Sequence, residues 1–343
     1  MKTNIKDFSQ SELEEHIIGL GEPKFRAVQI YKWLYRGIDD FDCMSNVPKS
    51  LREKLKSKFV PFGLKIKKKF VSKLDGTARY LLKLNDGNYI EAVLMKYEHG
   101  YSICVSSQVG CAMGCRFCAS TRNGKIRNLT MGEIVDQILA VQGDLGSRIS
   151  NVVMMGVGEP LDNFENVVKF ITNINNENGL NIGQRHVTLS TCGLVDKIYR
   201  LAALDLQSTL AISLHATDDE ARSAIMPINK RYGIDELIKA CRYYADRTRR
   251  RITFEYTMIS GLNDKIADAE KLAKLLHGML CHVNLIPVNT VEGTGFSPAG
   301  RKSVNRFLDK LNSCGVPATV RREMGSDISA ACGQLRAAAE ECS

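Results

Sequence analysis

One stretch indicates the fold of this chain most clearly: Tyr101-Ser-Ile-Cys-Val-Ser-Ser-Gln-Val-Gly-Cys111-Ala-Met-Gly-Cys115-Arg-Phe-Cys118. It starts with a short apolar run at 101–107, which is typical of a buried strand. A loop with three cysteines in eight residues follows, and three thiolates so close together can converge on one polynuclear metal centre. A glycine at position 114 gives the loop freedom to turn around such a centre. Chemistry placed directly after a strand is typical of the C-terminal edge of a parallel α/β barrel.

Short apolar runs alternate with helical patterns from this stretch onward. The expected strands are 101–107, 151–156, 186–191, 208–214, 251–259 and 281–288. The expected helices are 130–146, 163–178, 195–204, 233–248, 264–280 and 300–315. Thr130-Met-Gly-Glu133 is a capping-box pattern at the start of the first helix. Six βα units in series predict an α/β fold with a parallel sheet, and six are too few for a closed eightfold barrel, so we expect a partial, open (βα)6 barrel.

The chain before this barrel has a different character. Residues from Phe8 to about Lys58 carry helical periodicity, and Phe70 to Met95 changes to short alternating runs separated by turn signals. We therefore expect three parts: a small, basic, helical RNA-binding accessory domain at 1–70, a β-meander linker at 71–98, and a catalytic domain at 99–343.

Composition limits the cellular setting. The chain has 343 residues with 44% hydrophobic content, and it contains no apolar run long enough to cross a membrane. Met1 to Glu15 lacks the apolar segment of a secretory signal. We therefore expect a cytoplasmic protein without membrane contact. Its 11 cysteines are then expected to stay reduced, as buried residues, metal ligands or catalytic thiols.

The formal net charge of +9 is concentrated in one region. Between Asn46 and Lys73 there are ten Lys or Arg residues and one acid, Glu53. Such a surface attracts polyanions such as nucleic acid, although a solvated lysine-rich face without a partner gives the same pattern. Further candidates for phosphate contacts are Arg247, Arg249, Arg250 and Arg251.

The three-cysteine loop leaves several chemistries open at this point. A structural zinc site normally has four ligands from two pairs, and no second close pair exists here, although His215 could act as a fourth ligand. Three cysteines packed in a loop without metal are the other plain alternative. A [4Fe–4S] cluster usually takes four cysteines, so three leave one iron open to a ligand. Polar residues end the other expected strands on the same edge, namely Gly158, Glu159, Ser190, Ser213, His215 and Asn289.

The cysteine spacing resembles that of the radical S-adenosylmethionine superfamily. The resemblance implies that Cys111, Cys115 and Cys118 hold a [4Fe–4S] cluster whose open iron binds S-adenosylmethionine, which is cleaved to a 5′-deoxyadenosyl radical. It implies that Gly158 and Glu159 contact the methionine amino group. The rest of the cofactor would be bound by Ser190, Ser213, Leu214, His215 and Asn289.

Two further cysteines narrow the family. Cys104 ends the first strand, and Cys332 lies in Ala330-Ala-Cys-Gly-Gln-Leu335, where small residues suggest an exposed, mobile loop. From spacing alone, Cys104 would be a buried strand cysteine. Together with Ser120-Thr121, Arg127-Asn-Leu129, Gly156-Val-Gly-Glu-Pro-Leu161, Ser213-Leu-His-Ala216 and Leu285-Ile-Pro-Val-Asn289, these segments resemble the dual-specificity ribosomal and transfer RNA methyltransferases that modify carbon 2 of adenine. The likeness runs from about Phe25 to Arg336.

The family mechanism answers a chemical problem, since carbon 2 of adenine is an electron-poor carbon that cannot attack a sulfonium methyl group. The resemblance implies that Cys332 first takes a methyl group from one S-adenosylmethionine. A second molecule supplies the radical that activates this methyl group for addition to the base, so two are used per turnover. Glu91 would accept a proton, and Cys104 would release the RNA through a transient disulfide with Cys332.

The implied substrates are adenosine in the peptidyl-transferase region of 23S ribosomal RNA and the adenosine 3′ of the anticodon in transfer RNA. A flavodoxin- or ferredoxin-like electron donor is a further expected partner, and we expect a monomer. Three alternatives remain: the related antibiotic-resistance methyltransferase of carbon 8, a radical activase of a partner protein, and a zinc-bearing RNA-binding protein. We expect no catalytic role for Cys43, Cys192, Cys241, Cys281, Cys314 and Cys342.

Overall fold

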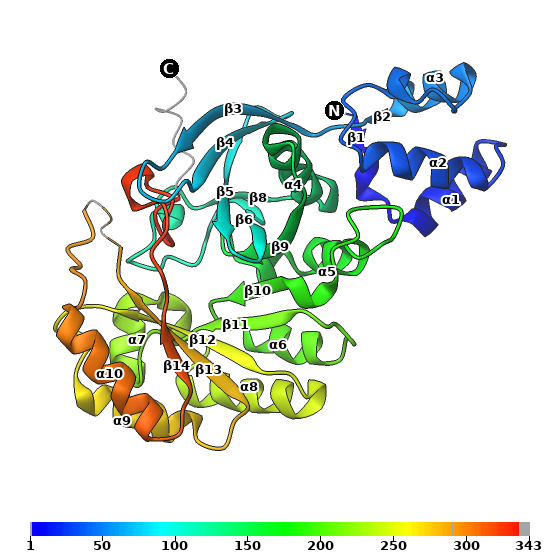
Figure 1. Ribbon diagram of the computed structural model, residues 1–343. Helices are drawn as coiled ribbons and strands as arrows, with labels where there is room; N and C mark the ends of the chain where they lie inside the picture. The colour runs from blue at the N-terminus through cyan, green and yellow to red at the C-terminus, as the bar shows by residue number, and fades with distance from the viewer. Residues whose placement is uncertain (1, 290, 292, 336–343) are drawn as a thin grey trace.

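A mixed sheet organises the fold in the computed structural model, which describes residues 2–289, 291 and 293–335 (Figure 1). Its strand order within that part of the chain is β14-β13-β12-β11-β10-β9-β6-β5-β4-β3. Cys342, expected to be incidental, lies outside the described residues. No helix of the described chain has both the length and the apolar character needed to cross a bilayer.

The parallel part of the sheet is the predicted open barrel. Its strands are β6 (Gly100–Cys104), β9 (Ile149–Met154), β10 (Val187–Thr191), β11 (Thr209–Ser213), β12 (Ile252–Met258), β13 (Cys281–Pro287) and β14 (Ala318–Val320). Each of the six expected strands is present, and every neighbouring pair in this series is parallel. The partial barrel is therefore confirmed. The additional strand β14 was not expected, because three residues of which two are exposed carry no periodic signal.

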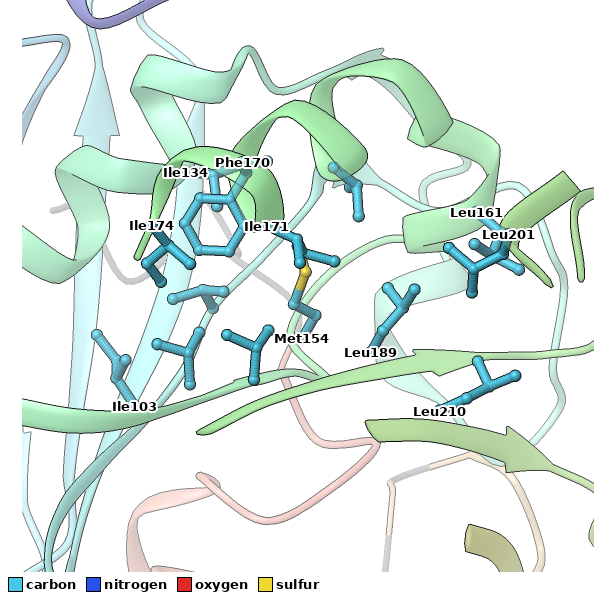
Figure 2. Packing of buried hydrophobic residues seen from close by; sticks show 14 of the residues in the cluster. Ile103, Ile134, Met154, Leu161, Phe170, Ile171, Ile174, Leu189, Leu201 and Leu210 are labelled. Carbon is cyan, nitrogen blue, oxygen red and sulfur yellow. The ribbon is translucent and has the colours of Figure 1, made fainter. Parts of the chain in front are cut away.

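The crossover helices cover the outside of the barrel. They are α4 (Met131–Leu145), α5 (Phe164–Asn173), α6 (Val195–Ala202), α8 (Ile234–Thr248), α9 (Ile266–Leu276) and α10 (Arg301–Ser313). A short helix that the sequence did not predict, α7 (Asp219–Ile225), precedes α8. Figure 2 shows the apolar side chains of α4 and α5 packed against those of β9 and β10, for example Phe170 and Ile134 near Met154. Burial of this layer stabilises the barrel and fixes where its strands end.

The start of α4 and the end of α5 can be compared with the predicted helix ends. The capping box of α4 is confirmed: the Thr130 hydroxyl accepts the Glu133 amide at 3.2 Å, and the Glu133 carboxylate accepts the Thr130 amide at 3.0 Å. Helix α5 ends at Asn173, before the expected residue 178. The run from Asn173 to Gly179 is rich in asparagine, whose side chain competes for backbone hydrogen bonds and favours turns.

Antiparallel strands extend the barrel sheet on one side. They are β3 (Leu64–Val71), β4 (Ala78–Leu84) and β5 (Tyr89–Tyr97), and β5 pairs with β6, the first barrel strand. The meander is therefore part of the same sheet, and its first strand begins before the expected transition at Phe70.

A group of N-terminal helices lies beside this sheet, at the blue end of Figure 1. The helices are α1 (Gln10–Gly19), α2 (Phe25–Leu34) and α3 (Lys49–Lys58), and β1 (Thr3–Asn4) pairs with β2 (Phe59–Val60) to close the group. Lys6 and Asp136 of α4 form a fully buried ion pair at 3.0 Å. This pair joins the N-terminal segment to the barrel, and breaking one side of it would leave an unpaired buried charge.

Candidate active site

The cysteine loop is held by a small hairpin that the sequence did not predict. Strands β7 (Gln108–Gly110) and β8 (Lys125–Asn128) pair on either side of it. Gly110 has φ +73°, and a Cβ there would lie 1.9 Å from the Gly124 carbonyl oxygen, so only glycine fits. The Cys111 amide donates to the same oxygen at 3.0 Å, and the Arg116 amide donates to the Ile225 carbonyl at the end of α7 at 2.9 Å. These contacts fix the loop above the barrel.

The cysteine loop and the strand ends line one open cavity, whose space together with the solvent at its mouth is about 930 Å³. Its lining contains most of the residues expected from the sequence, namely Cys111, Cys115, Cys118, Gly158, Glu159, Ser190, Ser213, His215, Asn289 and Cys332. Leu214, Cys104 and Glu91 do not line it. Leu214 is buried in the apolar core.

The donor set fits an iron–sulfur cluster. Burial first, and then its anionic neighbours, raise the pKa of the Cys111 thiol to about 12; burial also raises the pKa values of Cys115 and Cys118. Thiols in such a setting lose their protons when a metal centre binds and supplies positive charge. Among the described residues, no three His, Cys, Asp or Glu side chains converge closely enough to bind one metal ion. In the described chain the three thiols thus line one cavity without forming a single-ion site.

Glu159 has a structural task that the sequence did not reveal. One carboxylate oxygen accepts the Leu161 amide at 3.0 Å, and the other accepts the Cys192 amide at 2.8 Å. The carboxylate thereby joins the ends of β9 and β10. Gly158 next to it has φ +108°, and a Cβ there would lie 2.6 Å from the Gln108 side chain. The segment can lie this close to β7 only because position 158 has no side chain.

His215 is a neutral hydrogen-bond donor facing the cavity. Burial first, and then the charge of Arg222, lower its pKa to about 3. Its Nδ1 accepts the Thr257 amide at 2.9 Å, so the remaining proton is on Nε2. The imidazole lies edge-on to the Phe117 ring of the cysteine loop, with 5.0 Å between ring centroids. Its backbone has φ +59°, in the left-handed region.

The segment carrying Cys332 is fastened to the cysteine loop. The Ala119 amide donates to the Gly333 carbonyl at 2.7 Å, and the Ser120 hydroxyl donates to the Leu335 carbonyl at 2.6 Å. From the end of β13, the Asn289 side chain donates to the Cys332 carbonyl at 2.9 Å. These three bonds place Cys332 at the edge of the cavity.

The expectation of an exposed loop around Cys332 was wrong. Cys332 itself is half-buried, and Ala330, Ala331 and Leu335 are buried. Small alanines, which suggested an open loop, instead permit close packing against the meander. The segment is also fixed at its other end, where the Gly325 amide donates to Asp75 at 2.9 Å.

Cys104 lies behind Cys332. It ends β6 and packs in a second apolar cluster with Val93, Met95 and Ala330. Burial first, and then the neighbouring Cys332 thiol, raise the pKa of Cys104 to about 12. Both cysteines are free thiols. The two sulfurs are therefore electrostatic neighbours, although only Cys332 lines the cavity.

Glu91 lies further from the cavity. It is fully buried in β5 and forms an ion pair with Arg79 of β4 at 2.5 Å. Because side chains alternate along a strand, Glu91 and Val93 are on the same face of the sheet, and Val93 pairs in register with Cys104. Glu91 therefore faces the side of the sheet on which the Cys104 cluster lies.

The basic stretches occupy two separate places. Lysines of β3 at positions 65, 67, 68 and 69 are exposed along the edge of the sheet. The arginines at 247 and 249–251 lie at the end of α8 and the start of β12, at the amino ends of the parallel strands. Arg250 donates there to the Ser208 carbonyl at 3.2 Å. These arginines are therefore at the edge of the barrel opposite the cavity.

Sequence reasoning missed two charged residues of the cavity. Glu255 lies inside β12, and Arg321 follows β14; the nearest nitrogen and oxygen atoms of these two side chains are 3.6 Å apart. Glu255 carried a usable signal, since a carboxylate inside an otherwise apolar strand requires a function or a partner. Arg321 had none, because β14 was not recognised.

Comparison with known proteins identifies the family of this chain. Residues 105–276 match the Radical SAM superfamily model, and residues 3–60 match the Ribosomal RNA large subunit methyltransferase N-terminal domain. The chain is 56% identical to a probable dual-specificity RNA methyltransferase RlmN from Clostridium botulinum (strain Eklund 17B / Type B), covering 97% of this chain and 96% of that protein. It is 53% identical to the protein of the same description from Alkaliphilus oremlandii, covering 98% of each.

A solved structure indicates the same family. The crystal structure of a radical SAM methyltransferase from Sphaerobacter thermophilus superposes with a TM-score of 0.94 at 46% identity, covering 98% of this chain and all of that one. The expected family is thus confirmed over nearly the full length. With its cysteine loop, open barrel and N-terminal domain, the chain belongs to the RlmN family of radical SAM methyltransferases.

Proposed function

We propose that this protein methylates carbon 2 of adenosine in RNA. The observation that carries the proposal is the position of Cys332, which borders the same cavity as Cys111, Cys115 and Cys118. A thiol fixed at that point can accept a methyl group and carry it to an RNA base. Because the relatives are named dual-specificity RNA methyltransferases, we assign two substrates: 23S ribosomal RNA in the peptidyl-transferase region, and the transfer RNA adenosine 3′ of the anticodon.

We assign this cavity to a [4Fe–4S] cluster on the three thiols and to S-adenosylmethionine beside it, because the thiols and the polar strand ends line it together. When bound, this pair supplies one-electron cleavage of a sulfonium C–S bond. Both carboxylate oxygens of Glu159 already accept backbone amides, so the carbonyls of the segment at Gly158 are the better acceptors for the methionine amino group. The further cofactor contacts we propose are Ser190, Ser213, His215, Asn289 and the backbone of Leu214.

The thiol pair defines the reaction. Cys332 sulfur would attack the methyl carbon of one S-adenosylmethionine and become a thioether, releasing S-adenosylhomocysteine. The radical from a second molecule would take one hydrogen atom from that methyl group, so that its carbon can bond to the base. The base would then lose a proton and one electron, and the electron would return to the cluster. Cys104 then attacks the Cys332 sulfur, which frees the methylated RNA and leaves a disulfide. Because the pKa of Cys104 is about 12, its thiol must lose a proton before it attacks. A different proton leaves the adenine base, and we propose Glu91, on the same face of the sheet as the Cys104 cluster, as the acceptor of that proton.

Partners follow from the surface and from the chemistry. The exposed lysines of β3 and the lysines of α3 are the surface we assign to RNA phosphates. A flavodoxin- or ferredoxin-like protein would reduce the cluster, and the cytoplasm would reduce the disulfide after each turnover. We propose that the protein acts as a monomer.

Two cysteine variants test this function. Cys332→Ala should load the cluster and cleave S-adenosylmethionine but leave RNA unmethylated; Cys104→Ala should accumulate a covalent protein–RNA adduct, seen as a retarded band on a denaturing gel. The exposed Cys314→Ala is the control and should behave as the parent. Full methylation by Cys332→Ala would refute the methyl-carrier role, and methyl at carbon 8 in the parent's product would favour the antibiotic-resistance type of enzyme.

A further inference from the structure

Arg222 of α7 is a buried cation whose hydrogen bonds all go to neutral groups. None of its surface is exposed. Its guanidinium donates to the carbonyls of Cys192 at 2.8 Å, Ser213 at 3.1 Å and Leu214 at 3.1 Å, and to the Asn229 side chain at 2.9 Å. Within the described residues no carboxylate forms an ion pair with it. Asn229, which accepts from Arg222, donates in turn to the Asp219 carboxylate at 2.9 Å, so a carboxylate reaches the guanidinium only through an amide.

A buried charge without a counter-charge in direct contact is unfavourable, and Asp219 acts on Arg222 only from behind Asn229. Other groups around Arg222 lie closer to the cysteine loop. Burial lowers the pKa of Arg222, and the neighbours that oppose this most are the thiols of Cys192 and Cys115. Cys115 is one of the three cluster cysteines, and α7 holds the cluster loop directly through the Ile225 carbonyl and the Arg116 amide. Arg222 itself does not line the cavity; it lies behind the strand ends and holds the carbonyls of Cys192 and Ser213, two residues that do line it.

We propose that Arg222 is the built-in counter-charge of the iron–sulfur cluster and raises its reduction potential. The inference rests on the proposed binding of a [4Fe–4S] cluster by the three cysteines. Three thiolates outweigh the positive charge of an oxidised core, and reduction adds a further negative charge, so a nearby cation stabilises the reduced state more. At an effective dielectric constant of about 20, one charge about 10 Å away changes a one-electron equilibrium by roughly tenfold.

The experiment compares a variant that keeps the charge with one that removes it. Arg222→Lys keeps the cation without the planar fork, and Arg222→Gln keeps a polar side chain without the charge. Arg200→Gln is the matched control, because Arg200 is a half-exposed arginine of α6 paired with Glu165. Each reconstituted protein is titrated anaerobically without S-adenosylmethionine, and the reduced cluster is followed by electron paramagnetic resonance.

Arg222→Gln should shift the one-electron equilibrium tenfold toward the oxidised cluster, which lowers the midpoint potential by about 59 mV. The midpoint potential of Arg222→Lys should fall by much less, and that of Arg200→Gln should equal that of the parent. A parental potential in Arg222→Gln, or equal shifts in both Arg222 variants, would overturn the proposal.

Iron content and circular dichroism cover a failure to load. If Arg222→Gln folds but binds no cluster while Arg222→Lys binds one, the result supports the counter-charge proposal. If neither folded variant binds a cluster, the result refutes it. If Arg222→Gln does not fold without metal, the midpoint potential of Arg222→Lys decides the question. A fall of the full amount, about 59 mV, in this variant, which keeps the positive charge, would refute the counter-charge proposal. A parent without an iron–sulfur signal would instead contradict the proposed function.

Discussion

Ser120→Ala removes one of the bonds that fasten the Cys332 segment to the cysteine loop. The Ser120 hydroxyl donates to the Leu335 carbonyl at 2.6 Å in a buried setting. A hydrogen bond of this kind contributes about 1 kcal/mol net, so its loss should make local opening of the segment about fivefold more frequent. Because the Ala119 amide donates to the Gly333 carbonyl in the same contact, it exchanges its hydrogen only when the segment lifts.

Hydrogen-exchange mass spectrometry of the anaerobic, cluster-loaded protein measures this opening. The Ala119 amide should exchange about fivefold faster in Ser120→Ala than in the parent. Thr172→Ala is a control, since its exposed hydroxyl bonds only within α5, to the Val168 carbonyl at 2.9 Å. An unchanged Ala119 rate in Ser120→Ala, or an equal rise in both variants, would show that this bond does not hold the segment in place.

The remaining predictions concern folding and thiol reactivity. Gly158→Ala should lower the free energy of unfolding by about 2–3 kcal/mol in urea titrations, because the new Cβ would clash with Gln108 of β7 and position 158 has φ +108°. Gly143→Ala in α4 is the control: nothing lies near its Cβ position, so this variant should raise the free energy of unfolding by up to about 1 kcal/mol. Equal effects of the two substitutions would contradict the close approach of Gly158 to β7. Iodoacetamide should modify Cys104 of the metal-free protein far more slowly at pH 8 than the exposed cysteines, with a rate that still rises tenfold per pH unit above pH 9, since its pKa is about 12; a plateau near pH 9 would contradict this. Lys6→Met should cost about 3–5 kcal/mol at neutral pH by leaving Asp136 buried and unpaired. Burial raises the pKa of Asp136 in the folded state, so the native protein holds its proton to higher pH than the unfolded chain, and the loss should shrink as the pH falls through that raised value; a loss that grows in acid would contradict the sign.

The sequence predicted the barrel because short apolar runs alternate with segments that are apolar on one helical face, and the two patterns are easily told apart. It failed where an element depends on contacts made elsewhere. Strand β14 is too short for a pattern and exists only because β13 offers a paired edge. The hairpin around the cysteine loop depends likewise on the close approach of Gly110 to Gly124.

The site divides in the same way. The cluster cysteines and the polar strand ends could be placed from the sequence, since parallel strands bring their carboxyl ends to one edge. The burial of the Cys332 segment could not, because it depends on hydrogen bonds to residues more than 200 positions away, such as Ser120. Arg222 also gave no signal, since nothing in an arginine on a short helix shows that it is fully buried.

The most direct test of the account is the product of the parent protein. The reconstituted enzyme is incubated anaerobically with a 23S ribosomal RNA fragment, a reductant and S-adenosylmethionine carrying a deuterated methyl group, and the RNA is digested to nucleosides for mass spectrometry. The account predicts 2-methyladenosine with label from the methyl group. Unmethylated adenosine in a sample whose cluster is intact and reduced, or 8-methyladenosine, would contradict it.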